Sequence, residues 1–334
     1  MKNITRTFWL DRPVLVTGCT GLLGSWLTEA LIASGAKVVG LIRDRIPDSK
    51  LAEMGLIKQI SVVSGEVEDY QLIERTLNEY QIKTVFHLAA QTIVGIANQS
   101  ALSTFESNIR GTWQLLEGCR RTDWVEQVVI ASSDKAYGSH ERLPYSEDFP
   151  LEGRHPYDVS KSCADLISQS YWHTYRLPVC VTRCGNLFGG GDLNFNRLIP
   201  GTIHSIIRNE SPVIRSDGTF TRDYIYVEDA AEAYMKLAAE MGDNKDLHGH
   251  AFNFSYESPL KALEVVEKIL DLMDKKELHY KILNSALNEI PHQYLGSGKA
   301  RNMLNWSPRY NFEEGLKRTI PWYLNLIDKE ALND

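Results

Sequence analysis

The sequence predicts an α/β protein in which a doubly wound parallel sheet is followed by a smaller C-terminal α+β lobe. In the first half of the chain, short apolar runs rich in β-branched residues alternate with amphipathic segments, as expected for strands buried between two layers of helices. After Gly185 the alternation becomes irregular, the loops lengthen, and three consecutive glycines occur at 189–191. These observations together predict one large and one small lobe.

The expected parallel sheet takes six strands from the first half of the chain. The apolar runs are VLVTG from Val14, KVVGLI from Lys37, ISVVSG from Ile60, TVFHLAA from Thr84, QVVIASS from Gln127 and PVCVTR from Pro178. The helical patterns between them run roughly over 22–34, 69–80, 103–121 and 157–175. Repeated strand–helix–strand units imply right-handed crossovers and therefore a parallel sheet.

The second half of the chain sets the division into lobes. YIYVED, which starts at Tyr224, and the helix after it are expected to return to the first sheet. AFNFSY, which starts at Ala251, and the segment up to Trp322 are expected in the smaller lobe. We therefore predict a larger lobe of residues 1–185, to which about 222–250 return, and a smaller lobe of 186–221 and 251–334.

The composition is that of a folded globular protein. The chain has 334 residues and a mass of 37.9 kDa; 43% of its residues are hydrophobic and 24% are charged, which excludes disordered and fibrous classes. With 36 basic and 43 acidic residues, the net charge is −7 and the pI is near 5.8. Because nucleic-acid-binding proteins usually carry a basic excess, we expect no nucleic-acid partner.

Membrane, secretion and metal signals are missing from the sequence. It holds no run of 18 or more apolar residues, and the opening MKNITRTFWLDRP lacks the apolar core of a signal peptide. Five cysteines form an odd number without a C-x-x-C pair, so neither a disulfide framework nor a zinc site is expected. The prediction is a cytoplasmic protein with reduced thiols and no metal, in which His87 is a buried, hydrogen-bonded histidine.

The clearest motif is VLVTGCTGLLG, whose glycines follow the first strand directly and open the first helix. A backbone that turns sharply and approaches a pyrophosphate closely needs residues without a Cβ, and the helix N-terminus offers free N–H groups to the phosphates. The motif therefore predicts a Rossmann-type dinucleotide site. The expected cofactor contacts in this loop are Gly18, Thr20, Gly21, Leu22, Leu23 and Gly24.

The spacing G-x-x-G-x-x-G, with TG at its front, resembles the short-chain dehydrogenase/reductase superfamily. Nearly the whole chain is similar to its extended branch, the NAD-dependent nucleotide-sugar epimerases and dehydratases. The resemblance implies a tightly bound NAD or NADP, a nucleotide-diphosphate sugar as substrate, and a homodimer in which the helices over 103–121 and 157–175 pair across a two-fold axis. Further expected cofactor contacts are Glu66, against the adenine, and Val67, Leu88, Ala89 and Ala90.

The choice between NAD and NADP depends on the end of the second strand, GLIRDR. An acidic residue there would hold the ribose 2′-hydroxyl of NAD, whereas an arginine accommodates the 2′-phosphate of NADP. Ile42 stands where NAD-specific relatives usually carry Asp, and Arg43 follows it with Arg45 nearby, which favours NADP. Asp44 keeps NAD as the alternative.

Tyr157 and Lys161 lie four residues apart in HPYDVSKS, on one face of a predicted helix. We expect the lysine ammonium to favour the phenolate and to lower the pKa of the tyrosine toward the operating pH. Tyr157 would then accept a hydroxyl proton while a hydride leaves the same carbon. Y-x-x-x-K downstream of a glycine loop is also the signature of the family that the chain resembles, and both residues are expected to contact the cofactor.

The segment SSDKAYG, at the end of the fifth strand, distinguishes between chemistries. Ser133 is expected to share the substrate hydroxyl with Tyr157. A 4,6-dehydration also needs an acid for the C6 hydroxyl and a base for the C5 proton, which a 4-epimerisation does not. Dehydratases of the family usually carry Asp-Glu here, and Asp134-Lys135 resembles the CDP-glucose 4,6-dehydratase subgroup. We therefore predict Asp134 as the acid and Lys135 as the base or proton relay, which requires burial to keep the lysine neutral.

Substrate contacts are expected by resemblance at two further segments. FHLAAQ, which ends at Gln91, and GNLFGGGD followed by RLIP are similar to the same subgroup, and they imply that Gln91 contacts the substrate and that Asn186 and Arg197 lie near its diphosphate. Residues 221–224, Thr-Arg-Asp-Tyr, instead resemble dTDP- and GDP-sugar enzymes, in which Arg222 would pair with the diphosphate. The nucleotide base therefore stays open.

The predicted function is a nucleotide-sugar 4,6-dehydratase, a lyase that converts an NDP-hexose to an NDP-4-keto-6-deoxyhexose. A 4-epimerase or a 5,6-dehydratase on the same scaffold is the first alternative. A non-catalytic, cofactor-binding regulatory subunit is the second; the presence of Tyr157, Lys161 and Asp134 together is evidence against it.

Overall fold

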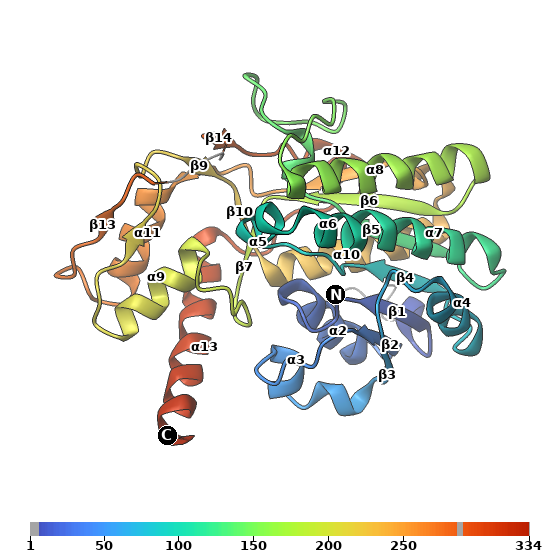
Figure 1. Ribbon diagram of the computed structural model, residues 1–334, viewed down its shortest axis with the longest axis horizontal. Coiled ribbons are helices and arrows are strands. Elements are labelled where there is room, and N and C mark those ends of the chain that lie inside the picture. Colours follow the sequence, from blue (N-terminus) through green and yellow to red (C-terminus); the bar gives the residue numbers. More distant parts are fainter. Residues whose placement is uncertain (1–6, 286–289, 334) are drawn as a thin grey trace.

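The computed structural model describes residues 7–285 and 290–333 and confirms the predicted α/β architecture (Figure 1). The main sheet is parallel, with the strand order β11-β6-β5-β4-β1-β2-β3. Its strands are β1 (Pro13–Thr17), β2 (Lys37–Ile42), β3 (Ser61–Ser64), β4 (Thr84–His87), β5 (Gln127–Ala131), β6 (Val179–Cys184) and β11 (Ala251–Phe254). The order reverses between β1 and β4, where a parallel sheet of this kind opens a crevice for ligands.

Helices cover both faces of the main sheet. On one face lie α2 (Leu22–Ala33) and α10 (Val227–Asp243), and on the other lie α4 (Tyr70–Glu79), α7 (Gly111–Arg121) and α8 (Pro156–Tyr175). The buried side chains of β1 alternate between two hydrophobic clusters: Val14 and Val16 belong to the first, and Leu15 belongs to the second. Both faces of the strand are therefore buried, which explains its uninterrupted apolar run.

The helix expected over 103–121 is divided into joined segments. They are α6 (Ala101–Phe105), a π-helical turn η2 (Glu106–Arg110) and α7. A π turn admits one extra residue, so it changes the direction of the side chains around it. Within η2, Asn108 Oδ1 accepts a hydrogen bond from the Gln91 amide at 2.7 Å, and its Nδ2 donates to Ser160 Oγ at 2.9 Å. The turn thereby connects α8 to the chain that follows β4.

Two strands lie elsewhere than the sequence predicts. β11 was expected in the smaller lobe but extends the main sheet beside β6, with Ala251 opposite Val181. β10 (Tyr224–Tyr226) was expected to return to the main sheet but pairs with β7 (Asn186–Phe188) in a separate two-stranded sheet. Only the helix after it, α10, returns to the first lobe, where it packs on α2. Both segments are short apolar runs, and their periodicity does not specify which edge they join.

In the described residues, the smaller lobe contains short strands and four helices. Its strands are β8 (Val213–Ile214), β9 (Thr221–Arg222), β12 (Leu260–Lys261), β13 (Lys281–Ile282) and β14 (His292–Gln293), and its helices are α9 (Leu198–Ile207), α11 (Ala262–Leu272), α12 (Gly298–Leu304) and α13 (Phe312–Asn333). The short elements elsewhere are α3 (Lys50–Glu53), η1 (Leu56–Gln59), α5 (Val94–Gln99), η3 (Asp134–Tyr137) and η4 (Lys245–Leu247).

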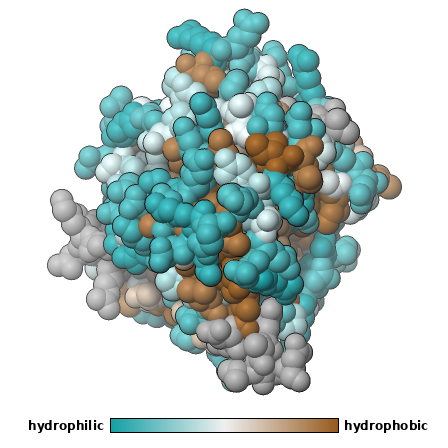
Figure 2. Space-filling view, turned by 90° about the vertical axis from the view of Figure 1, so that its left-hand side faces the viewer, coloured by the Kyte–Doolittle hydropathy of each residue, from teal (hydrophilic) through white to brown (hydrophobic). Residues whose placement is uncertain are grey.

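Figure 2 looks onto the side that carries α9 and α11, where hydrophilic residues cover most of the face and hydrophobic ones form patches between them. Across 7–285 and 290–333, no helix is long and apolar enough to span a bilayer.

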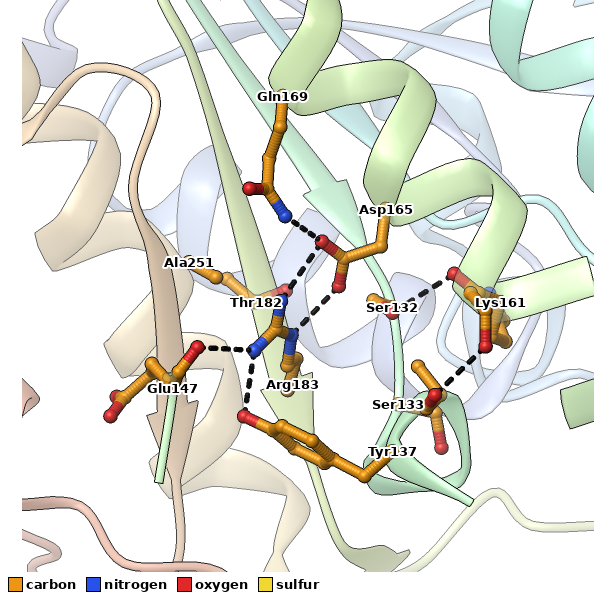
Figure 3. A network of polar contacts seen from close by, with 12 residues as sticks. Ser132, Ser133, Tyr137, Glu147, Lys161, Asp165, Gln169, Thr182, Arg183 and Ala251 are labelled. Carbon is orange, nitrogen blue, oxygen red and sulfur yellow. Dashed lines mark hydrogen bonds and ion pairs between the residues drawn. The ribbon is translucent and has the colours of Figure 1, made fainter. Parts of the chain in front are cut away.

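A buried ion pair joins α8 to the main sheet (Figure 3). Arg183 of β6 donates from Nε to Asp165 Oδ2 at 2.7 Å and from Nη2 to Asp165 Oδ1 at 3.0 Å, and both side chains are almost fully buried. The third guanidinium nitrogen donates to the hydroxyl of Tyr137 at 2.7 Å, and Tyr137 donates in turn to Asn253 Oδ1 at 2.7 Å. The network thus connects β6, α8, β11 and the end of η3, with both charges compensated.

Removing one member of the pair is expected to leave an unpaired buried charge. We predict that Asp165→Leu and Arg183→Met each lower the free energy of unfolding by about 3–5 kcal/mol, and that the double variant costs less than either single change. Urea unfolding at neutral pH measures these differences. The exposed pair Arg75–Glu79 provides the control, because Glu79→Leu is expected to cost less than about 1 kcal/mol. Additive losses in the double variant would contradict the prediction.

Candidate active site

The glycine loop between β1 and α2 has the close backbone packing that a dinucleotide site requires. Gly18 has φ +72°, and a Cβ on it would stand 2.8 Å from the backbone nitrogen of Ala89. A Cβ on Gly24 would overlap the carbonyl oxygen of Gly18. Gly21 is the residue before α2, and it has no side chain that could accept a hydrogen bond from the first N–H groups of this 12-residue helix. These N–H groups are therefore available to a ligand in the loop. The loop therefore fits a diphosphate bound to its backbone.

The end of β4 lies beside this loop and is tied to it by side chains. Thr17 Oγ1 accepts from the amides of Leu88 and Ala89, both at 3.2 Å, and pairs with His87 Nδ1 at 2.8 Å. His87 Nε2 meets Thr112 Oγ1 at 3.0 Å. Burial, aided by the Lys161 ammonium, lowers the pKa of His87 to about 3, so the ring is neutral. The predicted buried, hydrogen-bonded histidine is confirmed.

Arg43 and Glu66 follow β2 and β3, whose carboxyl ends lie at the same sheet edge as the loop. Arg43 Nε donates to the neighbouring Asp44 Oδ2 at 2.6 Å, and both side chains are more than half exposed. Glu66 is also exposed and lines an open surface pocket of about 510 Å³ with other acidic side chains, among them Glu68. The predicted residues therefore lie at the correct edge, but Asp44 competes for the guanidinium that was expected to favour NADP.

Tyr157 and Lys161 project from the first turns of α8 toward the end of β5, and both are buried. Lys161 Nζ donates to the carbonyl of Ala131 at 2.8 Å and lies 6.0 Å from the centre of the Tyr157 ring. Burial lowers the pKa of Lys161 to about 8 and raises the pKa of Tyr157 to about 12. This differs from the expected lowering of the tyrosine pKa. The main cause is desolvation of the buried phenol, and the nearby charge of Asp134 raises the pKa further.

Ser133 and Asp134 lie beside Tyr157 where β5 ends and η3 begins. The Ser133 hydroxyl donates to Asp134 Oδ1 at 2.9 Å, and it is also within hydrogen-bonding reach of the Tyr157 hydroxyl. Asp134 is 3% exposed, and its Oδ2 has no hydrogen-bond partner in the described parts of the chain. A buried carboxylate oxygen of this kind is costly unless a ligand or water bonds to it. The structure thus brings the serine, the acid and the tyrosine together.

Lys135 follows Asp134 on the same turn and points toward the smaller lobe. Its Nζ donates to Gln293 Oε1 at 2.5 Å, and its backbone amide donates to Ser133 Oγ at 3.2 Å. The carboxyl group of Asp158 on α8 is also close to Lys135. Burial raises the pKa of this carboxyl, and the positive charge of Lys135 partly offsets that rise. Lys135 is therefore in the same site as Asp134 but is oriented by a different lobe.

The predicted substrate residues lie around this centre at different distances from it. Arg197 is close enough to favour the Tyr157 phenolate, and its Nη1 pairs with Asp192 Oδ2 at 3.0 Å. Arg222 is buried, and its Nη1 donates to the Pro291 carbonyl at 3.0 Å. Gln91 accepts at Oε1 from the Ile93 amide, and Asn186 begins β7 beside the backbone of Asp223. Among these four residues, Arg197 is the one whose charge is seen to act on the tyrosine in the described parts of the chain.

Sequence reasoning missed three buried polar residues at the site: Asp223, Ser255 and Gln293. Asp223 is 1% exposed and accepts a hydrogen bond from Ser255 Oγ at one oxygen, while its Oδ1 lacks a partner among residues 7–285 and 290–333. Burial, and the nearby charge of Asp134, raise the pKa of Asp223 to about 7. The sequence could have indicated Asp223, because it follows Arg222 in the polar run Thr221-Arg222-Asp223. Gln293 lies in a two-residue strand without a motif and carried no such signal.

A dinucleotide-type loop and a Tyr–Lys pair that meet at one sheet edge are features of the epimerase and dehydratase class. The comparison with family models agrees: the model described as GDP-mannose 4,6 dehydratase matches residues 15–319. The chain therefore belongs to this family of NAD-dependent nucleotide-sugar epimerases and dehydratases, as its motifs predicted.

Relatives with both activities are similar to nearly the whole chain. The CDP-glucose 4,6-dehydratase of Salmonella typhimurium is 28% identical, over 98% of this chain and 95% of that protein. The solved dTDP-glucose 4,6-dehydratase of Streptomyces venezuelae, with NAD bound, has a TM-score of 0.85 and 26% identity, over 94% of this chain and 97% of that one. A solved epimerase from Methanothermobacter thermautotrophicus has a TM-score of 0.88 and 26% identity, over 98% and 96%. Fold and identity alone thus do not separate dehydration from epimerisation.

The raised pKa of Asp223 gives a testable pH dependence. In the folded state this carboxyl keeps its proton up to about pH 7, whereas in the unfolded state it loses the proton near its ordinary pKa of 3.8. The free energy of unfolding therefore falls as the pH rises from 3.8 to about 7. We predict that Asp223→Asn removes this cost and gains up to about 4 kcal/mol over the wild type between pH 4 and pH 8. Urea unfolding of both proteins across this range measures the difference. Parallel stability profiles would show that Asp223 ionises normally.

Proposed function

We propose that this protein is a nucleotide-sugar 4,6-dehydratase, which converts an NDP-hexose to an NDP-4-keto-6-deoxyhexose. The observation that carries the proposal is the turn Ser133-Asp134-Lys135 beside Tyr157, with Asp134 buried and its Oδ2 unpartnered in the described residues. An epimerase must oxidise and re-reduce one carbon, and it has no use for an additional acid and base at this position. A dehydratase needs both.

The proposed cofactor is NAD, held by the glycine loop, by the ends of β2, β3 and β4, and by Tyr157 and Lys161. Relatives support NAD, because solved dTDP-glucose 4,6-dehydratases are described in complex with it. The preference for NADP predicted from Arg43 has no such support, and the contact between Arg43 and Asp44 weakens it further. When bound, NAD would accept a hydride from the sugar and return it, and its positive charge would favour the Tyr157 phenolate. Identifying the dinucleotide released by denatured protein tests the assignment.

In the first half of the proposed reaction, Tyr157 removes the proton of the C4 hydroxyl while the C4 hydride leaves. Ser133 is within hydrogen-bonding reach of the tyrosine and is placed to share the same hydroxyl. Lys161, whose pKa is lowered to about 8, lies one helical turn from Tyr157 and contributes positive charge below that pH. The product of this half is a C4 ketone, which acidifies the proton at C5.

In the second half, water is eliminated across C5 and C6. Lys135 takes the C5 proton, the electron pair of that bond forms the C5–C6 double bond, and the C6–O bond breaks as Asp134 gives a proton to the leaving hydroxyl. Lys135 then returns a proton to C5, and the bound dinucleotide would supply the hydride to C6. Asp134 and Lys135 are neighbours on η3, but their side chains have separate partners, Ser133 for the acid and Gln293 for the lysine. Separate partners suit separate roles.

The substrate diphosphate is proposed to lie between the sheet edge and the smaller lobe, where Asn186, Arg197 and Arg222 are placed, with Gln91 nearer the sugar. We propose residues 186–226 and 255–334 as the substrate lobe, because β9 and β10 lie outside the main sheet and β11 moves 251–254 to the dinucleotide-binding lobe. Arg197 supports this position, since its charge favours the Tyr157 phenolate and 38% of its side chain is exposed to solvent. Its guanidinium can exchange Asp192 for a phosphate.

Incubation in deuterated water tests the proposed function. With CDP-, dTDP-, GDP- or UDP-hexose as substrate, we expect a 4-keto-6-deoxy product that has lost water and carries deuterium at C5, as read by NMR and mass spectrometry. Lys135→Met is expected to permit transient reduction of the cofactor, seen as absorbance at 340 nm, but to reduce water loss by at least 100-fold, on the scale of general base catalysis. Inversion at C4 without deuterium at C5 would establish the epimerase instead, and no turnover of any hexose would favour a regulatory subunit.

We also propose a homodimer formed through η2, α7 and α8, which lie side by side (Figure 1). Large apolar side chains are exposed on α6, α7 and α8 of this face: Leu102 is 75% exposed, Trp113 42% and Leu166 55%. A face with several exposed apolar side chains from adjacent helices is typical of a protein interface. A second copy of the chain would cover it.

Light scattering after gel filtration tests the dimer. The wild type is expected at twice 37.9 kDa, and Leu102→Asp at the monomer mass, because a charge in an apolar interface is left unpaired. Leu10, which is 61% exposed near the N-terminus, supplies the control, and Leu10→Asp should remain dimeric. A wild-type monomer would remove the proposal.

A further inference from the structure

Gln293 joins the smaller lobe to the turn that carries the proposed acid and base. Its Oε1 accepts from Lys135 Nζ at 2.5 Å, and its Nε2 donates to the carbonyl oxygen of Asp134 at 2.7 Å. The side chain is 0% exposed. The amide of Gln293 therefore bonds to the side chain of Lys135 through its oxygen and to the main chain of Asp134 through its nitrogen.

The strand that carries Gln293 is itself held against Arg222. In β14, Gln293 pairs with Arg222 of β9, and the Arg222 guanidinium donates to the Pro291 carbonyl at 3.0 Å. The Thr221 amide donates to the same carbonyl at 2.9 Å. The residue proposed to bind the diphosphate is thus bonded to the short segment from which Gln293 reaches Lys135. Hydrogen bonds between β9 and the segment 291–293 therefore link the two residues.

The chemistry of the contact suits a lysine that must act as a base. The oxygen of an amide carries no net charge, so Gln293 orients the amine without adding a second carboxylate to that of Asp158, which already acts on the lysine charge. Lysine has a long, flexible side chain, so a fixed acceptor restricts where its nitrogen can lie. The bond to the Asp134 carbonyl fixes the turn from which the lysine extends.

We infer that Gln293 is a positioning residue for the elimination half of the reaction. It orients Lys135 toward the C5 proton and links that orientation to the segment that contacts Arg222. The inference rests on the proposed dehydratase function and deepens it. Gln293 takes no part in the oxidation at C4, where Tyr157 and Ser133 act.

Single-turnover measurements of Gln293→Met separate the two halves, since methionine keeps the length of the side chain but makes neither bond. Water loss and deuterium uptake at C5 are expected to fall at least tenfold, while oxidation at C4, followed at 340 nm, changes less than twofold. Gln127 is the matched control: it is a buried glutamine on β5 that bonds to Arg12 and Thr84, and Gln127→Met should leave both halves within twofold. Equal slowing of both halves in Gln293→Met would overturn the inference.

A second readout does not depend on turnover. In protein labelled with ¹³C-lysine, the Lys135 ε-methylene signal is assigned by its loss in Lys135→Met, and it is expected to move in Gln293→Met but not in Gln127→Met. An unmoved signal overturns the inference even if the wild type is a dehydratase. A moved signal in a wild type that only epimerises supports the contact and rejects the proposed function. If Gln293→Met does not fold, Gln293→Asn replaces it, because the shorter amide cannot reach both partners.

Discussion

The buried contact between Arg183 and Asp165 is the constraint on which the arrangement of the site depends. It joins β6 to α8 four residues after Lys161, and through Tyr137 it reaches the end of the turn that holds Asp134 and Lys135. Two charges removed from water must keep their geometry, because either one alone is strongly unfavourable. The helix with the Tyr–Lys pair and the turn with the acid are therefore held against one sheet by the same guanidinium.

The site is assembled from two lobes, and each lobe supplies a different set of its residues. The main sheet provides the cofactor loop, the tyrosine and the acid on its carboxyl edge, where strand ends converge. The smaller lobe provides Arg222 and Gln293 on paired short strands. Oxidation at C4 would need only the first set, whereas elimination would need both. The difference between an epimerase and a dehydratase would then depend on contacts that cross between lobes.

Much of this site was predictable because its parts are local in sequence. The glycine loop, Tyr157 with Lys161, and Ser133 with its two neighbours each occupy a few consecutive positions, so spacing alone indicates their geometry. Gln293 was not predictable, because its partners lie about 158 residues away and its strand has no periodicity. The pKa of Tyr157 was predicted in the wrong direction, since the sequence places Lys161 nearby but does not show that the phenol is buried beside Asp134.

The sequence by itself determined the α/β class, the six strands of the first half, and the glycine-loop and Tyr–Lys motifs of the family, because these depend on periodicity and on residues close along the chain. Only the tertiary structure decided that β11 extends the main sheet, that β10 leaves it, and that the helix over 101–121 contains a π turn. The tertiary structure also decided that Gln293 of the smaller lobe accepts the hydrogen bond of Lys135. These features depend on long-range pairing and burial, whose energies are set by neighbours that local patterns do not reveal.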